Sequence, residues 1–243
     1  MSFSRKNNPY DTLIQIQQEF DEFIHLASHD LKEPARKVCT FAERLQESLK
    51  DKLSETEKDF FDRMLNAARR QQDMVDDLLT LSRVKTAVFT KAKIELKELF
   101  ESIELIKNVS ISVKVNEIVV GDKVQLKKVL QELIKNMIQF NQNSPKIEAY
   151  TKSIFSTIID SKGLNASKNY IYLLISDNGI GVSKENLSNI FKPFFKEHGH
   201  SQYKGAGLGL AISKTILEKM EGTIWCEPTN ESGSTFHILL PSD

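Results

Sequence analysis

The sequence lacks several features that would assign it to a specialised class of protein. Its 243 residues carry no net charge, because Lys plus Arg and Asp plus Glu both total 33, so no basic field predicts a nucleic-acid or anionic-membrane partner. No apolar run approaches the roughly 20 residues that cross a bilayer, and the first ten residues contain no apolar signal-peptide core. The only two cysteines, Cys39 and Cys226, share no short spacing with each other or with a histidine cluster. This pattern predicts two buried thiols in a cytoplasmic protein, without nucleic-acid or membrane contact within this chain.

Residues 10–86 lack glycine and contain a single proline, Pro34. Apolar residues recur there at steps of mostly three and four, which predicts a long amphipathic helix with the stripe Ile16, Phe20, Phe23, Ala27, Leu31, Val38, Phe41, Leu45 and Leu49. Ser54 and Glu57 have the spacing of a capping box that begins a second helix. The stripe of this second helix is Phe61, Met64, Leu65, Ala68, Val75, Leu78, Leu79 and Leu81.

Two long amphipathic helices joined by a short turn predict an antiparallel hairpin. A lone hairpin does not bury such wide apolar stripes, so we expect it to form a dimeric four-helix bundle in a homodimer. The alternative is a monomeric helical spacer.

From Val88 onward the sequence changes to short alternating runs, turns and shorter helices. Strands are predicted at residues 109–115, 117–120, 147–159, 170–176, 224–227 and 235–240, with a turn at 160–169. Asp122 is a suitable N-cap for a helix over 123–140, and a helix over 208–220 is stopped by Gly222. Residues 190–205 are expected to form a loop. This part is therefore predicted to be an α+β domain.

His29 lies at the edge of the first apolar stripe, where we expect solvent to reach it. Pro34 clashes with the carbonyl group four residues earlier, which predicts that the helix bends or loosens beside His29. A near-neutral imidazole is a usable nucleophile when one of its nitrogens is held as a donor, and Asp30 is placed to hold that proton. The alternatives are an exposed histidine without a role and a zinc site shared with His25, for which the sequence offers no third ligand nearby.

Four features of the second half point to a nucleotide. In the first, Glu132 and Asn136 lie one turn apart on the polar face of a predicted helix, and such oxygen ligands suit Mg²⁺ that is also held by phosphates. In the second, Asp177 ends a predicted strand, where its carboxylate can accept a hydrogen bond from an adenine amino group. Gly179 and Gly181 follow it and allow the backbone to approach a flat base.

The third feature is the run 205–209, in which Gly205, Gly207 and Gly209 lead into an apolar helix. Free N–H groups at the start of a helix can bind a phosphate, although the run is neither a Walker loop nor a dinucleotide fingerprint. The fourth is Thr235, placed where it can serve the adenine edge. Each feature taken alone is also consistent with an ordinary turn or surface helix.

Taken in order, these segments resemble the signature boxes of sensor histidine kinases over about residues 15–241. Residues 23–45 look like the phosphoacceptor helix and 131–136 like the asparagine box. Residues 177–181 and 205–210 match the two glycine boxes, and 190–195 match the phenylalanine box. Five boxes in one order make the resemblance specific.

The resemblance implies that residues 1–87 form a linker helix and a dimerisation and histidine-phosphotransfer hairpin. Residues 88–243 would then form a catalytic domain of the GHKL or Bergerat type, an ATP-binding α+β sandwich with a mixed sheet and helices on one face, similar to gyrase, Hsp90 and MutL-type ATPases. The implied reaction is ATP-dependent autophosphorylation of His29, followed by transfer to an aspartate in the receiver domain of a response regulator. An upstream sensor domain is expected to lie outside this chain.

The resemblance also assigns roles to single residues. Asp30 would orient and deprotonate His29, Asn136 would coordinate Mg²⁺ with Glu132 as a second ligand, and residues 190–207 would form the ATP lid. The implied ATP contacts are Asn136, Asp177, Gly179, Gly181, Phe191, Phe194, Lys196, Lys204, Gly205, Gly207, Leu208, Gly209 and Thr235.

Met137 and Gln139 stand where relatives often have alanine and lysine. They favour a second hypothesis, a degenerate kinase that dimerises and binds a response regulator with little turnover. A third hypothesis is an ATPase of the gyrase or Hsp90 type, against which the histidine hairpin ahead of the ATP domain argues.

Overall fold

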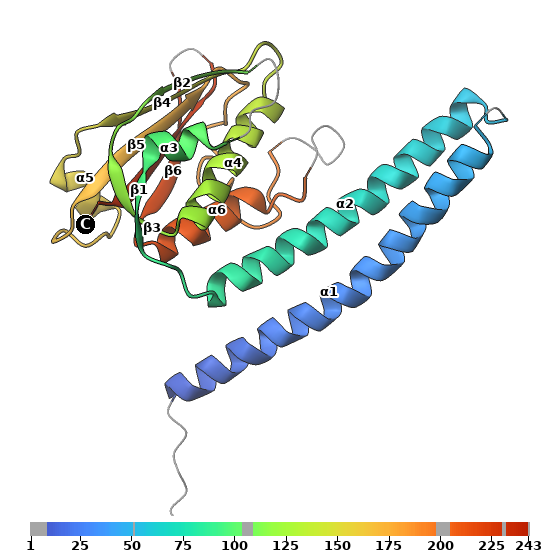
Figure 1. Cartoon of the computed structure of the whole chain (residues 1–243), viewed down its shortest axis with the longest axis horizontal. Coiled ribbons are helices and arrows are strands. Elements are labelled where there is room, and N and C mark those ends of the chain that lie inside the picture. The colour runs from blue at the N-terminus through green and yellow to red at the C-terminus, as the bar shows by residue number, and fades with distance from the viewer. Residues whose placement is uncertain (1–8, 51, 104–108, 198–204, 230–231, 243) are drawn as a thin grey trace, which may run out of the picture. The chain divides into compact units, whose positions relative to one another are not determined.

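The computed structural model describes residues 9–50, 52–103, 109–197, 205–229 and 232–242. The chain divides into two compact units, one up to Arg83 and one from Val84 onward. Figure 1 shows the helical hairpin of the first unit and the α+β domain of the second. No helix within the described ranges has the length and apolar character needed to cross a bilayer.

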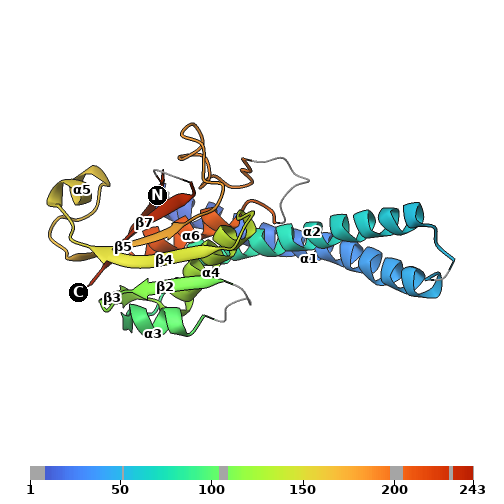
Figure 2. The same cartoon turned by 90° about the horizontal axis from the view of Figure 1, so that it is seen from above.

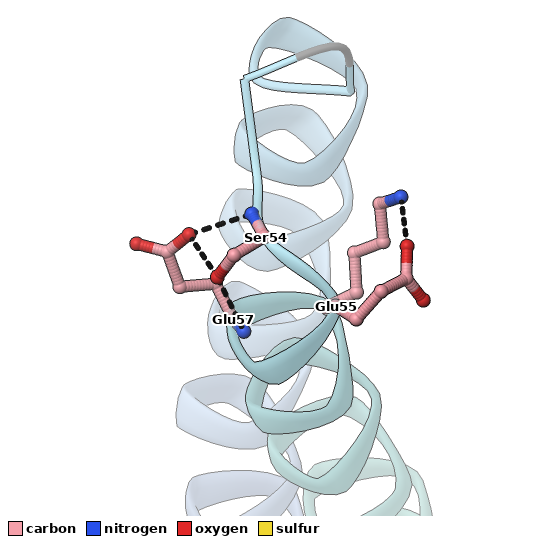
Figure 3. Close-up of polar contacts among 4 residues, drawn as sticks. Ser54, Glu55 and Glu57 are labelled. Atoms are coloured by element: carbon pink, nitrogen blue, oxygen red, sulfur yellow. Dashed lines mark hydrogen bonds and ion pairs between the residues drawn. The ribbon is translucent and has the colours of Figure 1, made fainter.

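The hairpin consists of α1 (Pro9–Ser48) and α2 (Glu55–Thr86). The helix α1 is continuous through Pro34 and gently curved in Figure 1. The predicted capping box begins α2, as Figure 3 shows: the Ser54 N–H donates to Glu57 Oε2 at 2.7 Å, and the Glu57 N–H donates to Ser54 Oγ at 3.3 Å. These contacts satisfy N–H groups that a helix start otherwise leaves unpaired, and the Ser54 hydroxyl lowers the pKa of Glu57.

The hairpin buries only part of its apolar surface within one chain. One cluster of its core is formed by Cys39, Ala42, Leu65 and Ala68, with Phe61 packed against them. An ion pair from Arg69 to Glu43 at 2.6 Å and a hydrogen bond from Gln46 to Asp62 at 3.1 Å join the two helices. Much of the predicted α1 stripe faces outward instead, since Leu31, Val38, Phe41 and Leu45 are all exposed.

The second unit is built on a mixed five-stranded sheet in the order β2-β4-β5-β7-β6. The β2–β4 pair is parallel and the other pairs are antiparallel. The strands are β2 (Ser110–Lys114), β4 (Lys146–Lys152), β5 (Tyr170–Asp177), β6 (Thr223–Pro228) and β7 (Ser234–Pro241). The strands β1 (Ala92–Glu95) and β3 (Ile118–Gly121) form a separate two-stranded antiparallel sheet.

Two longer helices, α4 (Lys123–Gln139) and α6 (Gly209–Lys219), pack against each other and cover one face of this sheet (Figure 2). As predicted, Asp122 is the N-cap of α4, and its Oδ1 accepts from the N–H groups of Val124 and Gln125 at 3.0 Å. The predicted buried stripe of α4 is confirmed, because its side chains are at most 3% exposed: Leu126, Val129, Leu130, Leu133 and Met137.

Three elements differ from the sequence prediction. The strand predicted at 147–159 was wrong in its second half, because β4 ends at Lys152 and α5 (Ser156–Ser161) follows. The β-branched residues there favour a strand locally, but Ile159 joins an apolar cluster with Tyr170, Tyr172 and Leu174 of β5, so α5 packs on the face of the sheet opposite α4 and α6. The strand β1 and the helix α3 (Leu96–Glu101) were not predicted.

Both cysteines are free and buried, as the sequence predicted. Burial raises the pKa of Cys226 to about 12. This thiol is therefore protonated at neutral pH and behaves as a small apolar side chain.

Candidate functional site

The histidine predicted to accept phosphate lies in α1, on the hairpin unit. The side chains around it differ in burial, because Ser28 is buried whereas Asp30 and Leu31 are exposed. An ion pair between Lys32 and Asp76 ties this part of α1 to α2. The side chains of His29 and His25 fall outside the described part of the structure, so the imidazole geometry and the zinc alternative stay predictions.

The Asp177 carboxylate, at the end of β5, is fixed by two backbone donors. The Gly179 N–H donates to Oδ1 at 2.6 Å and the Ser234 N–H donates to Oδ2 at 3.3 Å. Burial raises the pKa of Asp177, an effect that the two N–H groups partly offset. A half-buried carboxylate with a fixed orientation is suited to accept hydrogen bonds from one specific donor group.

Glycine surrounds this carboxylate because nothing larger fits. A Cβ atom on Gly179 would lie 2.7 Å from Asp177 Oδ1 and 2.8 Å from the Phe140 carbonyl oxygen. A Cβ on Gly233 would lie 2.1 Å from the Asp177 carbonyl oxygen, and Gly181 lies against Gly233 in turn. The predicted residues Asp177, Gly179 and Gly181 are therefore brought together, with Gly233 added to them.

Thr235 and Asn178 extend this cluster in different ways. The Thr235 hydroxyl is hydrogen-bonded to Ser176 Oγ at 2.8 Å, next to Asp177 on β5. Asn178 Oδ1 accepts from Asn141 Nδ2 at 2.7 Å and from the Lys146 N–H at 2.8 Å. The sequence prediction missed the second arrangement, because its partners lie 37 and 32 residues away along the chain.

The polar face of α4 forms a second cluster at the start of α6. Asn136 Nδ2 donates to Glu132 Oε1 at 3.3 Å, and Lys135 Nζ lies 3.7 Å from Glu132 Oε2. A Cβ atom on Gly209 would lie 2.0 Å from Glu132 Oε1. The absence of a side chain at Gly209 thus lets the Glu132 carboxylate lie beside the first turn of α6, where unpaired N–H groups attract anions.

The helix α4 also connects the two clusters. The Phe140 carbonyl oxygen at its C-terminal end accepts from the Ile180 N–H at 3.0 Å, which joins α4 to the segment after Asp177. Glu132 lies eight residues before Phe140, which corresponds to about 12 Å along an α-helix. The segment after Asp177 therefore lies at the C-terminal end of α4, and Asn136 and Glu132 lie about one and two turns farther back along the helix.

The predicted lid, residues 190–207, contains neither helix nor strand in its described portion. Phe191 is buried and meets Phe236 of β7 edge to face, at 6.4 Å between ring centroids. Phe194 is exposed and adopts a left-handed backbone with φ 64°, which is uncommon for a bulky residue. Its N–H donates to the Gly207 carbonyl oxygen at 2.9 Å, so the two ends of this stretch are joined.

The remaining predicted residues divide into three groups. Leu208 is fully buried directly before α6, and therefore supports the helix start with its side chain in the core. Lys196 is half-buried at the end of the described lid, and the Cβ position of Gly205 is open. Lys204 falls outside the described residues.

Comparison with known families identifies two domains. The model of the "His Kinase A (phospho-acceptor) domain" matches residues 21–87. The model of the "Histidine kinase-, DNA gyrase B-, and HSP90-like ATPase" matches residues 121–243. The predicted acceptor histidine lies in the first match, and the Asp177 and Glu132–Asn136 clusters lie in the second.

Individual proteins are similar over most of the chain. The phytochrome-like protein Cph1 of Synechocystis sp. is 32% identical, over 92% of this chain and 29% of its own length. The sensor-like histidine kinase SenX3 of Mycobacterium tuberculosis is 31% identical, over 91% of this chain and 53% of its own length. The chain thus spans about half or less of these relatives. The crystal structure of full-length ShkA with AMPPNP has the same fold, with a TM-score of 0.64 and 18% identity over 90% of this chain and 45% of ShkA.

Proposed function

This chain belongs to the histidine kinases of two-component signalling, and we propose that it transfers the γ-phosphoryl group of ATP to His29 and from there to an aspartate of a response regulator. The observation that carries the proposal is the Asp177 carboxylate, held by two backbone N–H groups among glycines at one end of α4. The family match makes the second unit an ATP-binding domain. The roles of single residues are our proposal.

Asp177 is proposed to recognise the adenine. An ionised carboxylate accepts hydrogen bonds, so the fixed Oδ atoms suit the exocyclic amino group of the base. The glycines at 179 and 181 let the backbone pack closely around this carboxylate, and we propose that the base lies against this segment. Thr235 of β7 pairs across the sheet with Ser176, the residue before Asp177. We propose that its hydroxyl also hydrogen-bonds to the adenine edge.

The first turn of α6 and the Glu132–Asn136 pair are proposed to face the phosphates. Asn136 and Glu132 lie about 6 and 12 Å before Phe140 along α4, a span that agrees with an extended nucleoside triphosphate whose base lies at Asp177. Gly205 and Gly207, with Lys196 and Lys204 from the lid, are proposed to complete the phosphate contacts, and Phe191 holds the lid to β7.

Mg²⁺ fits the residues at this end of the site. Glu132 and Asn136 offer hard oxygen ligands one helical turn apart. Two protein ligands suit a metal that takes its other ligands from phosphates and water. When bound, Mg²⁺ neutralises phosphate charge during transfer.

The proposed transfer needs a nucleophile and a proton acceptor. An imidazole nitrogen of His29 would attack the γ-phosphorus as the bond to the β-phosphate oxygen breaks and ADP leaves. Asp30 would accept the proton from the other ring nitrogen, which keeps the attacking nitrogen free. Positioning and charge stabilisation account for most catalysis in phosphoryl transfer, so these groups suffice without a covalent intermediate on the ATP-binding domain.

A homodimer and the receiver domain of a response regulator are the proposed partners. The exposed apolar side chains of the hairpin support the dimer, because a second hairpin would cover them. A sensor domain that supplies the signal is a further proposed partner.

The decisive experiment is incubation with γ-labelled ATP, followed by acid and base treatment of the labelled protein. We expect label that is lost in acid and stable in base, which is typical of phosphohistidine. His29→Gln should abolish the label and retain ATP binding, whereas Asp177→Asn should abolish binding.

Three outcomes would contradict the proposal. Stable phosphohistidine on the His29→Gln variant would show that another residue accepts the phosphate. ATP binding with turnover but no protein label would favour an ATPase, and binding without turnover would favour a degenerate kinase.

A further inference from the structure

Lys219 holds the first residues of the second unit, Val84 and Lys85, against α6. It lies in the last turn of α6, and its Nζ donates to the carbonyl oxygens of Val84 at 2.9 Å and Lys85 at 2.6 Å. These carbonyl groups are among the last four of α2 and have no partner within that helix. The same ammonium group lies 5.1 Å from the centroid of the Phe89 ring. A single lysine therefore holds two parts of residues 84–91, which we term the linker segment.

A second contact binds the linker segment to α4. The Thr90 N–H donates to Asp122 Oδ2 at 3.0 Å, while Oδ1 of the same carboxylate caps α4. One side chain thus begins α4 and holds the linker segment. A displacement of the linker segment would therefore act on the N-terminal end of α4, and the reverse holds as well.

The end of the linker segment is held by an ion pair. Lys91 Nζ lies 2.7 Å from Glu221 Oε1, and Lys168 binds the other oxygen of Glu221. The two lysines lower the pKa of Glu221 to about 2. Glu221 has φ 63°, a left-handed conformation that costs a non-glycine residue free energy. Glu221 therefore occupies an unfavourable backbone position in which it binds two cations.

These anchors attach to both helices that carry the nucleotide clusters. Lys219 ends α6, whose first residue, Gly209, lies beside Glu132. Asp122 begins α4, which carries Asn136 farther along. The linker segment is thus bonded to the far ends of the two elements that form the phosphate end of the site.

We propose that Lys219 is a positioning residue that fixes the linker segment to the ATP-binding domain and thereby sets the rate of phosphoryl transfer to His29 without setting the affinity for ATP. The inference rests on the proposed function. A linker segment released from its anchors would act as a flexible tether, and the γ-phosphate would sample many more positions relative to His29. Its effective concentration at the acceptor would fall, whereas the nucleotide contacts would persist.

The test compares Lys219→Met with Lys214→Met in the full chain. Lys214 lies on the same helix and pairs only weakly within it, with Glu218 at 3.8 Å, so it controls for the loss of one positive charge. We expect Lys219→Met to lower the autophosphorylation rate at saturating ATP by roughly tenfold. The Kd for a fluorescent ATP analogue should change less than about twofold, Lys214→Met should resemble the wild type, and Lys219→Arg should restore part of the rate.

Hydrogen–deuterium exchange provides a readout that does not depend on activity. Amide exchange across residues 84–91 should accelerate in Lys219→Met and stay at the wild-type rate in Lys214→Met. Unchanged exchange would overturn the anchor, and an unchanged rate at saturating ATP, or a Kd that weakens in proportion to the rate, would overturn the positioning role. A wild-type chain that forms no phosphohistidine would contradict the proposed function instead, while the exchange result would still decide the anchor.

Discussion

The Asp177 carboxylate combines a proposed binding role with a cost to the stability of the ligand-free protein. Its two backbone donors, from Gly179 and Ser234, orient it, but burial still raises its pKa. A raised carboxyl pKa means that the folded state disfavours the ionised form. The ionised form is nevertheless the one that accepts from an amino group, so the site is better arranged for its proposed ligand than for stability alone.

The raised pKa predicts how the difference in free energy of unfolding between the wild type and Asp177→Asn changes with pH. In the folded wild type, the pKa of Asp177 lies above its ordinary value of about 4, so the native state binds the proton more readily than the unfolded state does. Lowering the pH through this window should therefore stabilise the wild type relative to the variant, by less than about 1.4 kcal/mol per pKa unit. Urea unfolding of both proteins without nucleotide, at pH 7 and pH 5, measures the difference.

The control for this experiment is Asp160→Asn, which removes an exposed carboxylate from α5 in the same domain. It shows how the removal of one carboxylate from this domain changes unfolding at each pH while the Asp177 site is intact. A wild type that loses stability relative to Asp177→Asn on acidification would contradict the direction of the shift.

Met137 loses weight as evidence for a degenerate kinase. Its side chain is only 3% exposed and belongs to the buried stripe of α4, so it fills the core and does not point toward a nucleotide.

Gln139, the last residue of α4, is half-buried. If a lysine at this position raises the phosphorylation rate in relatives, Gln139→Lys should raise turnover several-fold, because about 1.4 kcal/mol of transition-state stabilisation is a tenfold change. Single-turnover labelling measures this, and an unchanged rate would show that other groups supply the charge.

At the scale of elements, the capping box of α2 has a measurable share in hairpin stability. Ser54→Ala removes both hydroxyl contacts with Glu57 (Figure 3), and the loss of such a cap costs about 1 kcal/mol. We expect a lower thermal midpoint for the hairpin, measured by circular dichroism at a fixed protein concentration, with ATP binding unchanged. Ser48→Ala, at the C-terminal end of α1, is the matched control; an equal loss in both variants would argue against the cap.

Asn178 offers a second prediction at this scale, because it fixes the loop between α4 and β4 against the segment after Asp177. Asn178→Ala leaves Asn141 and the Lys146 N–H without their acceptor, so the loop should loosen and ATP affinity should fall by about three- to tenfold. Asn178→Asp keeps the acceptor and loses only the donation to the Ser144 carbonyl oxygen at 3.2 Å. It should therefore bind ATP more tightly than the alanine variant; the reverse order in a fluorescent-analogue titration would refute this role.

Elements with strong local signals were predictable from the sequence, and those that depend on distant contacts were not. The caps at Ser54 and Asp122 are set by side chains within three residues, so spacing alone located both helix starts. The helix α5 has no such signal, and its Ile159 is stabilised by β5 residues that follow it in the chain. The same holds for Asn178, whose role depends on the register between β4 and β5.

At the scale of the whole molecule, the hairpin and the ATP-binding domain differ in how fully they bury their apolar side chains. The second unit buries its largest apolar side chains fully, as in Leu126, Leu173 and Ile216. In the hairpin, Leu65 and Val75 are buried, whereas large apolar side chains such as Phe41 and Phe60 stay exposed. An ATP-binding domain with a filled core, attached to a hairpin with exposed apolar side chains, agrees with assembly through the hairpin.

That surface has the spacing of a helix–helix seam. Leu31, Val38 and Leu45 follow a seven-residue repeat, and Phe41 lies three residues after Val38, which are the a and d positions of a heptad. Phe41 is 59% exposed in the single chain, and Phe60 on α2 is 62% exposed. Large aromatic side chains at such positions gain free energy from burial, so a second hairpin is the expected cover.

The prediction is that Phe41→Glu converts the protein from dimer to monomer. A carboxylate buried in the seam without a partner costs several kcal/mol, which is enough to dissociate a micromolar dimer. Light scattering at micromolar concentration should give twice the 27.7 kDa chain mass for the wild type and the chain mass for the variant. Arg36→Glu places the same charge at an exposed position of α1, five residues and about 140° around the helix from Phe41, and should remain a dimer. A monomeric wild type, or a Phe41→Glu variant that stays dimeric, would show that the exposed stripe serves another contact.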